Sequence, residues 1–546
     1  MKIESAIKSV LITLFIIIYF WWFDILFSLF SEMFLPMPIK SYSNIDVVKY
    51  FFEIELVPSR KMIKANNQIV FIANKSEEFI KLDFSNNYTI KSLELNGKSV
   101  KYDFSNNILK VNSAFILEEN NVLKISYYGH PSTTRTFGLV FSENNKPISV
   151  YTINEPSFAR TWFPCSDKPY DKALVEMKII NDSNYTSVSN GNLIAVTKNG
   201  DKKTFHWESE YPVAPYYISI YSSYYKANEF VKEIKGNKYL IKTYLTGRNY
   251  LNGSNDFFAA ISSLDFLCNN FGAYPFISEK IGLAEINWEY GAIENQTAIG
   301  VGNKFITGDS RFLSLYVHEL AHAWFGNSVG IKSWKDIWVV EGFASYAEII
   351  FAEEYFKNDK TKYLKILESF SNTSPVSPLF NSFGNPFDRF IYEKGARVFL
   401  MLENEIGKEK FRTLLKQFFE DYKFNSITTQ KFQSYLENKI GKSLKVFFEQ
   451  WIYRGVGLPK MNILYKIDNS TKSNIELEIN QLQTDYRPYK YPLEISFVRE
   501  DKNESLTKTY YIKASKTIIK ESFDFKIAKI IPDPNRKLLA QFIIKR

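Results

Sequence analysis

Apolar residues along the chain form three patterns, and the first is a nearly uninterrupted run close to the N-terminus. Residues Ser9–Phe23 carry no charge, and after one aspartate a second apolar run covers Ile25–Ser31. A helix over residues 9–31 would be about 35 Å long, which is enough to cross a bilayer. Trp21 and Trp22 suit a membrane–water interface. This pattern predicts an uncleaved membrane anchor.

The charges beside this run predict its orientation. Lys2 and Lys8 lie on its N-terminal side, which favours a cytoplasmic N-terminus and an extracytoplasmic body. Two alternatives stay open. The run also fits the hydrophobic region of a secretory signal, whose cleavage would give a secreted or periplasmic protein, although no clear small-x-small cleavage site follows it. The second alternative is a buried helix of a soluble protein.

From Val47 onward the pattern changes to short runs of alternating apolar and polar residues, separated by asparagine-rich turns. Alternation with a period of two is typical of strands that bury one face. Asn96-Gly97 and Asn199-Gly200 are turn signals of the kind that connects hairpin strands. The chain up to about residue 240 is therefore predicted to be a β domain, with strands that include Gln68–Ala73, Phe79–Phe84, Val122–Tyr128 and Tyr216–Ser222.

The third pattern consists of apolar residues at helical spacing and covers much of residues 244–457. It predicts helices at Leu313–Phe325, Trp334–Phe356, Phe390–Ile406 and within Lys408–Tyr453. Alternation returns after Pro459 and predicts a second, small β domain, with strands at Ile463–Tyr465, Ile475–Ile479, Leu493–Val498, Thr507–Ile512 and Phe523–Phe525.

The first of these predicted helices contains the sequence His-Glu-Leu-Ala-His at residues 318–322. Residues four apart lie on the same face of a helix, so His318 and His322 can direct two imidazoles at one point, as a tetrahedral zinc requires. Glu319 is turned aside from the pair and can take a proton from a zinc-bound water. The alternative is that both histidines are core residues. Because the chain has only four histidines, we favour the metal site.

A third ligand is needed, and Glu341 follows His322 after eighteen intervening residues. Asn327 and Gly330 predict a turn between the two helices, and an antiparallel second helix would bring Glu341 back over the histidine pair. Two histidines and one glutamate leave a fourth position for water. This is the open coordination of a catalytic zinc rather than the closed coordination of a structural one.

Three further segments carry candidate functional groups. Gly291 and Ala292 allow close approach of another backbone, as an edge strand lining a cleft would require, and Glu294 would face the bound chain. Tyr392 can donate its phenolic O–H to a developing oxyanion, although it is one of 35 tyrosines. Glu155 lies in a proline-rich irregular loop with charges in an apolar setting, where a carboxylate without a functional role is an equally good interpretation.

Composition narrows the class of protein. A chain of 546 residues accommodates about three or four domains, and its 45% hydrophobic and 23% charged residues are typical of globular proteins. The net charge of +9 comes from scattered basic residues, which argues against nucleic acid as a partner. Two cysteines, Cys165 and Cys268, exclude a disulfide framework. His130 and His206 lack ligand-type neighbours and are interpreted as ordinary surface or core histidines.

These motifs together resemble the gluzincin zinc aminopeptidase family that includes aminopeptidase N and leukotriene hydrolase. The family motif Gly-x-Met-Glu-Asn is similar to residues 291–295, with Ile293 in the methionine place, and the zinc motif is complete at residues 318–322 and Glu341. The family's catalytic tyrosine, in a Tyr-x-Lys-Gly context, matches Tyr392. The segment around Glu155 resembles the signature Glu-Pro-x-x-Ala-Arg-x-x-Phe-Pro-Cys-x-Asp-x-Pro.

The resemblance covers roughly residues 45–460, and the motifs occur in the family order. Two positions depart from the family pattern. Val340 stands where an asparagine usually precedes the zinc glutamate, and Lys168 stands where an acidic residue is common. Neither change removes a catalytic atom, so both concern the tuning of the site.

The resemblance implies a multidomain α+β fold. We expect an anchor or signal segment at residues 1–40, a saddle-like β-sheet domain at 41–243, a thermolysin-like, mostly α catalytic domain at 244–457 and a small β-sandwich at 458–546. The large helical fourth domain of many family members has no room in this sequence. A cleft without that domain is expected to be more open.

The resemblance also implies an activity, the hydrolysis of the N-terminal peptide bond of peptides with a free amino terminus. One Zn²⁺ would be held by His318, His322 and Glu341. Glu319 would act as general base and Tyr392 would stabilise the oxyanion. The implied substrate-binding residues are Glu155, Gly291, Ala292, Glu294 and Asn295, of which Glu155 and Glu294 would receive the α-ammonium group.

Two other functions are alternatives to this one. A catalytically silent, peptide-binding scaffold on the same fold would be expected to have lost the metal ligands or the base, all of which are present here. An epoxide hydrolase side activity, as in leukotriene hydrolase, is the second alternative, and no residue calls for it. The oligomeric state and the preferred N-terminal residue of the substrate do not follow from the sequence.

Overall fold

The computed structural model describes residues 40–546 except for 74–78, 113–115, 117, 132–135, 144–146, 371–377, 381–387, 455–457, 470–472, 484–487 and 503. The membrane anchor predicted at residues 9–31 lies outside these residues. Within them, no helix combines the length and the apolar character needed to cross a bilayer. The chain divides into two compact units, the first running to Trp334 and including Tyr422–Ile427, and the second formed by Lys335–Asp421 and Thr428–Arg546.

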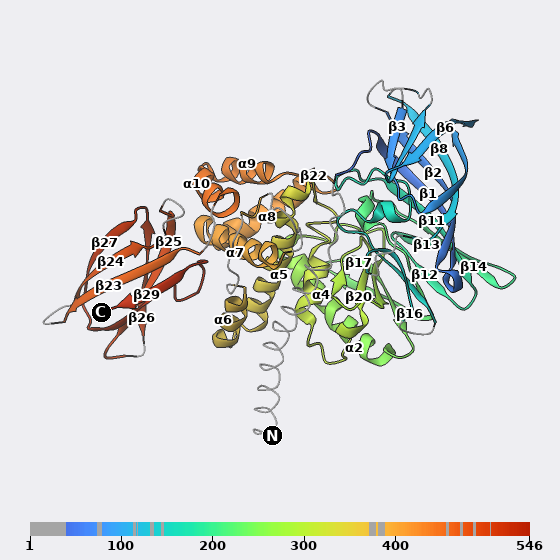
Figure 1. Ribbon diagram of the computed structural model, residues 1–546. Helices are drawn as coiled ribbons and strands as arrows, with labels where there is room; N and C mark the ends of the chain where they lie inside the picture. Colours follow the sequence, from blue (N-terminus) through green and yellow to red (C-terminus); the bar gives the residue numbers. More distant parts are fainter. Residues whose placement is uncertain are drawn as a thin grey trace. The chain divides into compact units, whose positions relative to one another are not determined.

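A large antiparallel sheet with one parallel pair forms the beginning of the first unit (Figure 1). Its strand order is β13-β14-β11-β1-β2-β8-β4-β5. Buried and exposed residues alternate along the long strands, because each strand presents one face to the core. The bounds are β1 Asp46–Val57, β2 Met62–Ile72, β4 Tyr88–Leu95, β5 Lys98–Ser99, β8 Asn120–Gly129, β11 Leu174–Asp182, β13 Asn192–Asn199 and β14 Lys202–Glu208.

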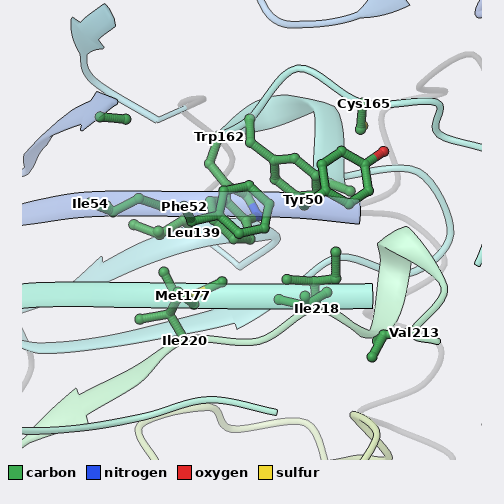
Figure 2. Packing of buried hydrophobic residues seen from close by; sticks show 14 of the residues in the cluster. Tyr50, Phe52, Ile54, Leu139, Trp162, Cys165, Met177, Val213, Ile218 and Ile220 are labelled. Atoms are coloured by element: carbon green, nitrogen blue, oxygen red, sulfur yellow. The ribbon is translucent and has the colours of Figure 1, made fainter. Parts of the chain in front are cut away.

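Aromatic side chains fill the core beside this sheet (Figure 2). The rings of Phe52 and Phe163 meet edge to face with centroids 5.0 Å apart, and those of Trp162 and Phe163 with centroids 4.4 Å apart. Two smaller sheets complete this part of the unit, with orders β12-β15-β10-β9 and β3-β7-β6. Their bounds are β3 Phe79–Asp83, β6 Lys101–Ser105, β7 Ile108–Asn112, β9 Gly138–Ser142, β10 Ser149–Ile153, β12 Thr186–Val188 and β15 Tyr221–Ser223.

The strand predicted at Tyr216–Ser222 is mostly wrong. Residues Pro215–Tyr217 form a 3₁₀ turn, and the strand β15 begins only at Tyr221. Proline at the first position of the turn supplies the φ that such a turn needs. The whole segment is buried, so its apolar character does not report a strand with one exposed face.

A five-stranded sheet in the first unit leads to the candidate site. It has the order β16-β17-β18-β20-β19, in which β17, β18 and β20 run parallel and the two-residue strand β19 is the last. Helices α2 and α3 connect β17 to β18, as parallel strands require. The bounds are β16 Tyr225–Ile234, β17 Asn237–Thr246, α2 Tyr250–Ser262, α3 Leu264–Phe271, β18 Ile281–Ile286, β19 Ala292–Ile293 and β20 Ala298–Gly302.

Helix α4 covers Leu313–Ala321 and is shorter than the predicted helix Leu313–Phe325. His322 is its C-terminal capping residue and keeps helical backbone angles. The next amides bond three residues back, from Ala323 to Leu320 O and from Trp324 to Ala321 O. These tighter bonds end the helix.

In the second unit, helix α5 covers Trp338–Tyr355 and α7 covers Arg389–Ile406, and the two helices pack against each other. They touch at two glycines. A Cβ built on Gly342 would come within 2.8 Å of the Gly395 Cα, and one built on Gly395 within 2.8 Å of the Gly342 Cα. The remaining helices of the unit are α6 Lys360–Ser369, α8 Lys408–Tyr422, which ends one residue inside the first unit, α9 Thr429–Ile440, α10 Lys445–Phe448 and a π-helical turn at Glu449–Tyr453.

The C-terminal part of the second unit is a β-sandwich, as predicted. One sheet has the order β27-β24-β23-β29 and the other β26-β25-β28. The rings of Phe497 and Phe523, one from each sheet, pack with centroids 4.6 Å apart. The bounds are β23 Lys460–Asp468, β24 Ser473–Gln481, β25 Tyr491–Arg499, β26 Ser505–Ile512, β27 Lys516–Phe523, β28 Ile527–Pro532 and β29 Gln541–Lys545.

Candidate metal centre

The two histidines of the His-Glu-Leu-Ala-His sequence converge at the C-terminal end of α4. Their Nε2 atoms lie 3.1 Å apart, and the two rings are nearly perpendicular at 77°. The Nδ1 atom of His322 lies 3.1 Å from the carbonyl oxygen of Phe325. A proton on that Nδ1 would be donated to the carbonyl, which leaves the Nε2 lone pair for a metal.

The turn after α4 needs a glycine. Gly326 has φ +131°, and a Cβ at this position would lie 3.0 Å from both His322 Nδ1 and the Tyr217 hydroxyl. The amide of Asn327 donates to the carbonyl of His322 over 3.0 Å. A side chain at residue 326 would therefore displace the ring of a predicted metal ligand.

Glu341, from the first turn of α5, joins the histidine pair. The ligand atoms of His318, His322 and Glu341 all lie within 4.8 Å of one another, and the three residues are buried. Two zinc–nitrogen bonds at a tetrahedral angle would separate the nitrogens by about 3.3 Å, close to the distance between the two Nε2 atoms. Two imidazoles and one carboxylate are the donor set of a catalytic zinc, so the residues present fit this ion.

A second group, of carboxylates, shares one member with the first. Oxygens of Glu155, Glu294 and Glu341 lie within 4.8 Å of one another, and all three residues are buried. Burial, together with the nearby Tyr216, Glu294 and Glu155, raises the pKa of the Tyr217 hydroxyl well above its ordinary value. Three buried carboxylates at this distance repel one another, and bound cations would offset that repulsion.

Glu319 is 5% exposed and lies in the last turns of α4. With Ile299, Thr297 and Asn327 it lines a small cavity of about 10 Å³. The carboxylates of Glu319 and Glu294 both act on Tyr221, whose pKa is raised by burial and, to a smaller extent, by these two charges. The predicted base therefore belongs to the same charged neighbourhood as Glu294.

The segment Gly291–Asn295 contains β19, the edge strand of the five-stranded sheet. Gly291 has φ +154°, its carbonyl accepts from the amide of Gly302 over 2.9 Å, and Ala292 and Ile293 form β19. The side-chain amide of Asn295 donates to the Tyr221 hydroxyl over 2.7 Å. This arrangement agrees with the predicted edge strand, along which a peptide can add by main-chain hydrogen bonds.

Tyr392 lies near the N-terminus of α7, three residues before the glycine that touches α5. It is half-buried. Two residues later Lys394 is buried, and this burial lowers the pKa of its ammonium group to about 7. Glu341 immediately precedes Gly342, the glycine of α5 in the same contact. Both Glu341 and Tyr392 are therefore close in sequence to the point where the two helices touch.

Several residues around the site were missed by sequence reasoning. Tyr217 and Tyr221 contact or face the acidic group, while Asn190 and Asn327 donate hydrogen bonds to the backbone that carries Glu294. Asn327 was singled out from the sequence, but only as a turn residue. The others come from the β domain, and no local pattern marks them.

The chain was compared with known protein families. The model described as the Peptidase M1 N-terminal domain matches residues 49–217, and the model of the Peptidase family M1 domain matches residues 259–451. The chain is 27% identical over 478 residues to probable aminopeptidase 2 of Sulfurisphaera tokodaii, covering 82% of this chain and 60% of that relative. It is 26% identical over 361 residues to aminopeptidase N of Rattus norvegicus, covering 58% and 36% respectively. The chain thus spans 60% or less of the length of these relatives.

Two solved structures share the fold. Legionella pneumophila aminopeptidase A in complex with aspartic acid superposes with a TM-score of 0.82 at 18% identity, covering 93% of this chain and 60% of that one. A two-domain M1 zinc metallopeptidase bound to L-tryptophan gives a TM-score of 0.67 at 20% identity, covering 76% and 96%. Because both M1 models match in order and the fold agrees, this chain belongs to the M1 family of zinc metallopeptidases.

Proposed function

We propose that this protein is a zinc-dependent aminopeptidase that removes the N-terminal residue from peptides with a free amino terminus. The observation that carries this proposal is the shared carboxylate of Glu341, which belongs both to the group with the two histidines and to the group with Glu155 and Glu294. A metal site and an acidic site for a cation thus adjoin. The carboxylates would bind the ammonium group of a substrate, and the metal site beside them would hydrolyse the bond next to that group.

His318, His322 and Glu341 would hold the zinc ion. A bound Zn²⁺ supplies a Lewis acid that acidifies a water molecule and polarises a carbonyl group. The role of the chain is to orient these ligands. The ring of His322 is oriented by its contact with the Phe325 carbonyl and by the turn at Gly326, which packs against the same Nδ1 atom.

Glu319 would take the proton from the attacking water and pass it to the leaving amine. Its position next to His318 in α4 places its backbone beside the metal ligands while its side chain is turned away from them. The low exposure of the carboxylate strengthens its electrostatic interactions with reacting groups. Tyr392 would donate its hydroxyl proton in a hydrogen bond to the developing oxyanion.

Glu155 and Glu294 would receive the α-ammonium group of the substrate. Their oxygens lie within 4.8 Å of one another, which a single ammonium group can bridge. A peptide paired with the edge strand β19 would then end at these carboxylates. The cut would fall one residue from the amino terminus, and an acetylated terminus would leave both carboxylates without their cation.

The first prediction concerns metal removal. The purified protein is expected to hydrolyse aminoacyl-p-nitroanilides and not their N-acetyl analogues, to fall to the background rate after dialysis against a zinc chelator, and to recover on addition of Zn²⁺. The measurement is the release of p-nitroaniline, together with the metal content of the dialysed protein. Turnover that persists in the metal-free protein would contradict the proposal.

A second prediction concerns the ammonium site. Glu294→Ala is expected to raise KM for aminoacyl substrates by about 10- to 150-fold, because one charged hydrogen bond is lost. It should also reduce the discrimination between free and N-acetylated substrates. Glu289→Ala is a matched control, since this carboxylate lies five residues earlier, is exposed and pairs with Lys304. If Glu294→Ala discriminates as the wild type does, Glu294 does not bind the amine.

A further inference from the structure

The backbone that carries Glu294 is held on both sides of Asn295 by asparagine side chains. The amide of Asn327 donates to the Glu294 carbonyl over 2.9 Å, and the amide of Asn190 donates to the Gln296 carbonyl over 2.6 Å. One asparagine comes from the turn after the metal-binding helix, and the other comes from the β domain. The two contacts fix the same short segment from different parts of the fold.

Each asparagine lies in a turn that is itself held by the ammonium group of a lysine. The Lys172 ammonium donates to the carbonyls of Asn327 and Ser328, both over 2.7 Å. The Lys280 ammonium donates to the carbonyls of Ser189 and Gly191, which flank Asn190, again over 2.7 Å. The same pattern therefore occurs twice: one lysine holds two carbonyls of a turn, and the asparagine of that turn holds a carbonyl beside Asn295.

Further contacts stiffen the turn at Asn190. Its side-chain carbonyl accepts from the amide of Ser219 over 2.8 Å, and the amide of Gly191 donates to the Thr297 hydroxyl over 2.9 Å. Gly191 has φ +73°, and a Cβ there would lie 2.1 Å from the carbonyl oxygen of Glu208. The turn therefore has no room for a side chain at residue 191, and it contacts the segment after Glu294 at both Gln296 and Thr297.

The turn at Asn327 is tied to the metal centre. The same residue that holds Glu294 donates its backbone amide to the carbonyl of His322 over 3.0 Å. A displacement of this turn would therefore move the backbone of a predicted metal ligand and the backbone of Glu294 together. Lys172, two residues before β11, lies 155 residues before Asn327 in the sequence.

The two lysines are unusual residues for these places. Burial lowers the pKa of Lys172 to about 7, and burial also lowers the pKa of Lys280 to about 7 despite the favourable charge of Glu279. Removing an ammonium group from water is costly, and an apolar side chain of similar length would fill the same space without that cost. What the ammonium group provides is a pair of short, charge-assisted hydrogen bonds to two carbonyls at once.

We propose that Lys172 and Lys280 are positioning residues, which fix the turns at Asn327 and Asn190 and through them set the place of the Glu294 carboxylate. This inference rests on the proposed role of Glu294 in binding the substrate's α-ammonium group. Neither lysine touches the substrate. They keep the Glu294 carboxylate in the position that binds the amine before the substrate arrives.

The experiment compares Lys172→Met and Lys280→Met with Lys178→Met. This control lies in β11, the strand that follows Lys172, and is half-buried like Lys172. Each of the first two substitutions is expected to raise KM for aminoacyl substrates by about 3- to 10-fold, the effect of one hydrogen bond, with a smaller change in kcat. Loss of general folding stability would instead lower the amount of active enzyme and leave KM unchanged.

A second measurement does not depend on activity. Hydrogen exchange followed by mass spectrometry is expected to show faster exchange in a peptide covering residues 292–298 in both lysine variants, with no change in the Lys178→Met control. If the wild type hydrolyses no aminoacyl substrate, the proposed function fails, whereas the exchange data still test the two lysines. Unchanged KM and unchanged exchange in folded variants would overturn the inference.

Asn327→Leu provides the test should a lysine variant fail to fold. It removes only the amide that donates to the Glu294 carbonyl and leaves Lys172 in place. The same rise in KM and the same faster exchange at residues 292–298 are expected. An Asn327→Leu protein with wild-type KM and wild-type exchange would overturn the inference in the same way.

Discussion

Substitution of Glu319 by glutamine is expected to lower kcat for aminoacyl substrates by about 10²- to 10⁴-fold, the usual contribution of a general base. Glutamine has nearly the same shape but cannot accept the proton of the attacking water. The metal ligands are unchanged, so the zinc content and the thermal unfolding midpoint should stay close to those of the wild type. The measurements are steady-state kinetics, metal analysis and a thermal melt of the same preparation.

Glu233→Gln is the control for this substitution, because Glu233 is an exposed carboxylate in the same compact unit. It should leave kcat unchanged. A Glu319→Gln protein that turns over at the wild-type rate while holding one zinc ion would show that the proton is accepted elsewhere. A protein that has lost its zinc would assign Glu319 a structural role at the metal instead.

Substitution of Tyr392 by phenylalanine is expected to lower kcat by about 10²- to 10³-fold, as the loss of one oxyanion donor typically does. The hydrogen bond is needed only when charge develops on the carbonyl oxygen, so KM should change far less than kcat. The change removes a single oxygen atom near the N-terminus of α7, where the ring is half-buried. Steady-state kinetics with one aminoacyl-p-nitroanilide measures both constants.

Tyr355→Phe is the matched control, since Tyr355 lies in the same unit at the end of α5 and is 64% exposed. Its kinetic constants should equal those of the wild type. If Tyr392→Phe raises KM strongly and leaves kcat unchanged, the hydroxyl binds the substrate and does not stabilise the transition state. Equal losses in both variants would point to a general effect of the substitutions.

The sheet regions were predictable because their signal is local. The alternation along Val122–Tyr128 and the turn at Asn96-Gly97 correspond to β8 and to the β4–β5 hairpin. The segment Tyr216–Ser222 misled the prediction because it is buried throughout, and Pro215, just before it, starts a 3₁₀ turn instead of a strand. The end of α4 also escaped prediction, because it depends on the tight bonds after Ala321.

Those residues of the candidate site that belong to short sequence motifs could be predicted. His318 and His322 are one helical turn apart, and their convergence follows from the helix itself. The contacts that prepare Glu294 join residues far apart in the chain, such as Asn190 with Gln296. A lone sequence shows a lysine at 172 or 280 as one basic residue among 68, and only the fold shows what its ammonium group holds.

The assignment of residues 9–31 as a membrane anchor stays a prediction from the sequence, as do the cytoplasmic N-terminus and the extracytoplasmic body. The proposed chemistry does not depend on it. The residues proposed for metal binding, proton transfer and amine binding all lie between Glu155 and Tyr392, within the part of the chain that the structure describes.

The glycine-to-glycine contact between α5 and α7 limits which substitutions this protein can accept. Glu341 and Tyr392 sit within three residues of that contact, on opposite helices. Even one added methyl group at either glycine would spread the helices and carry the two functional side chains apart.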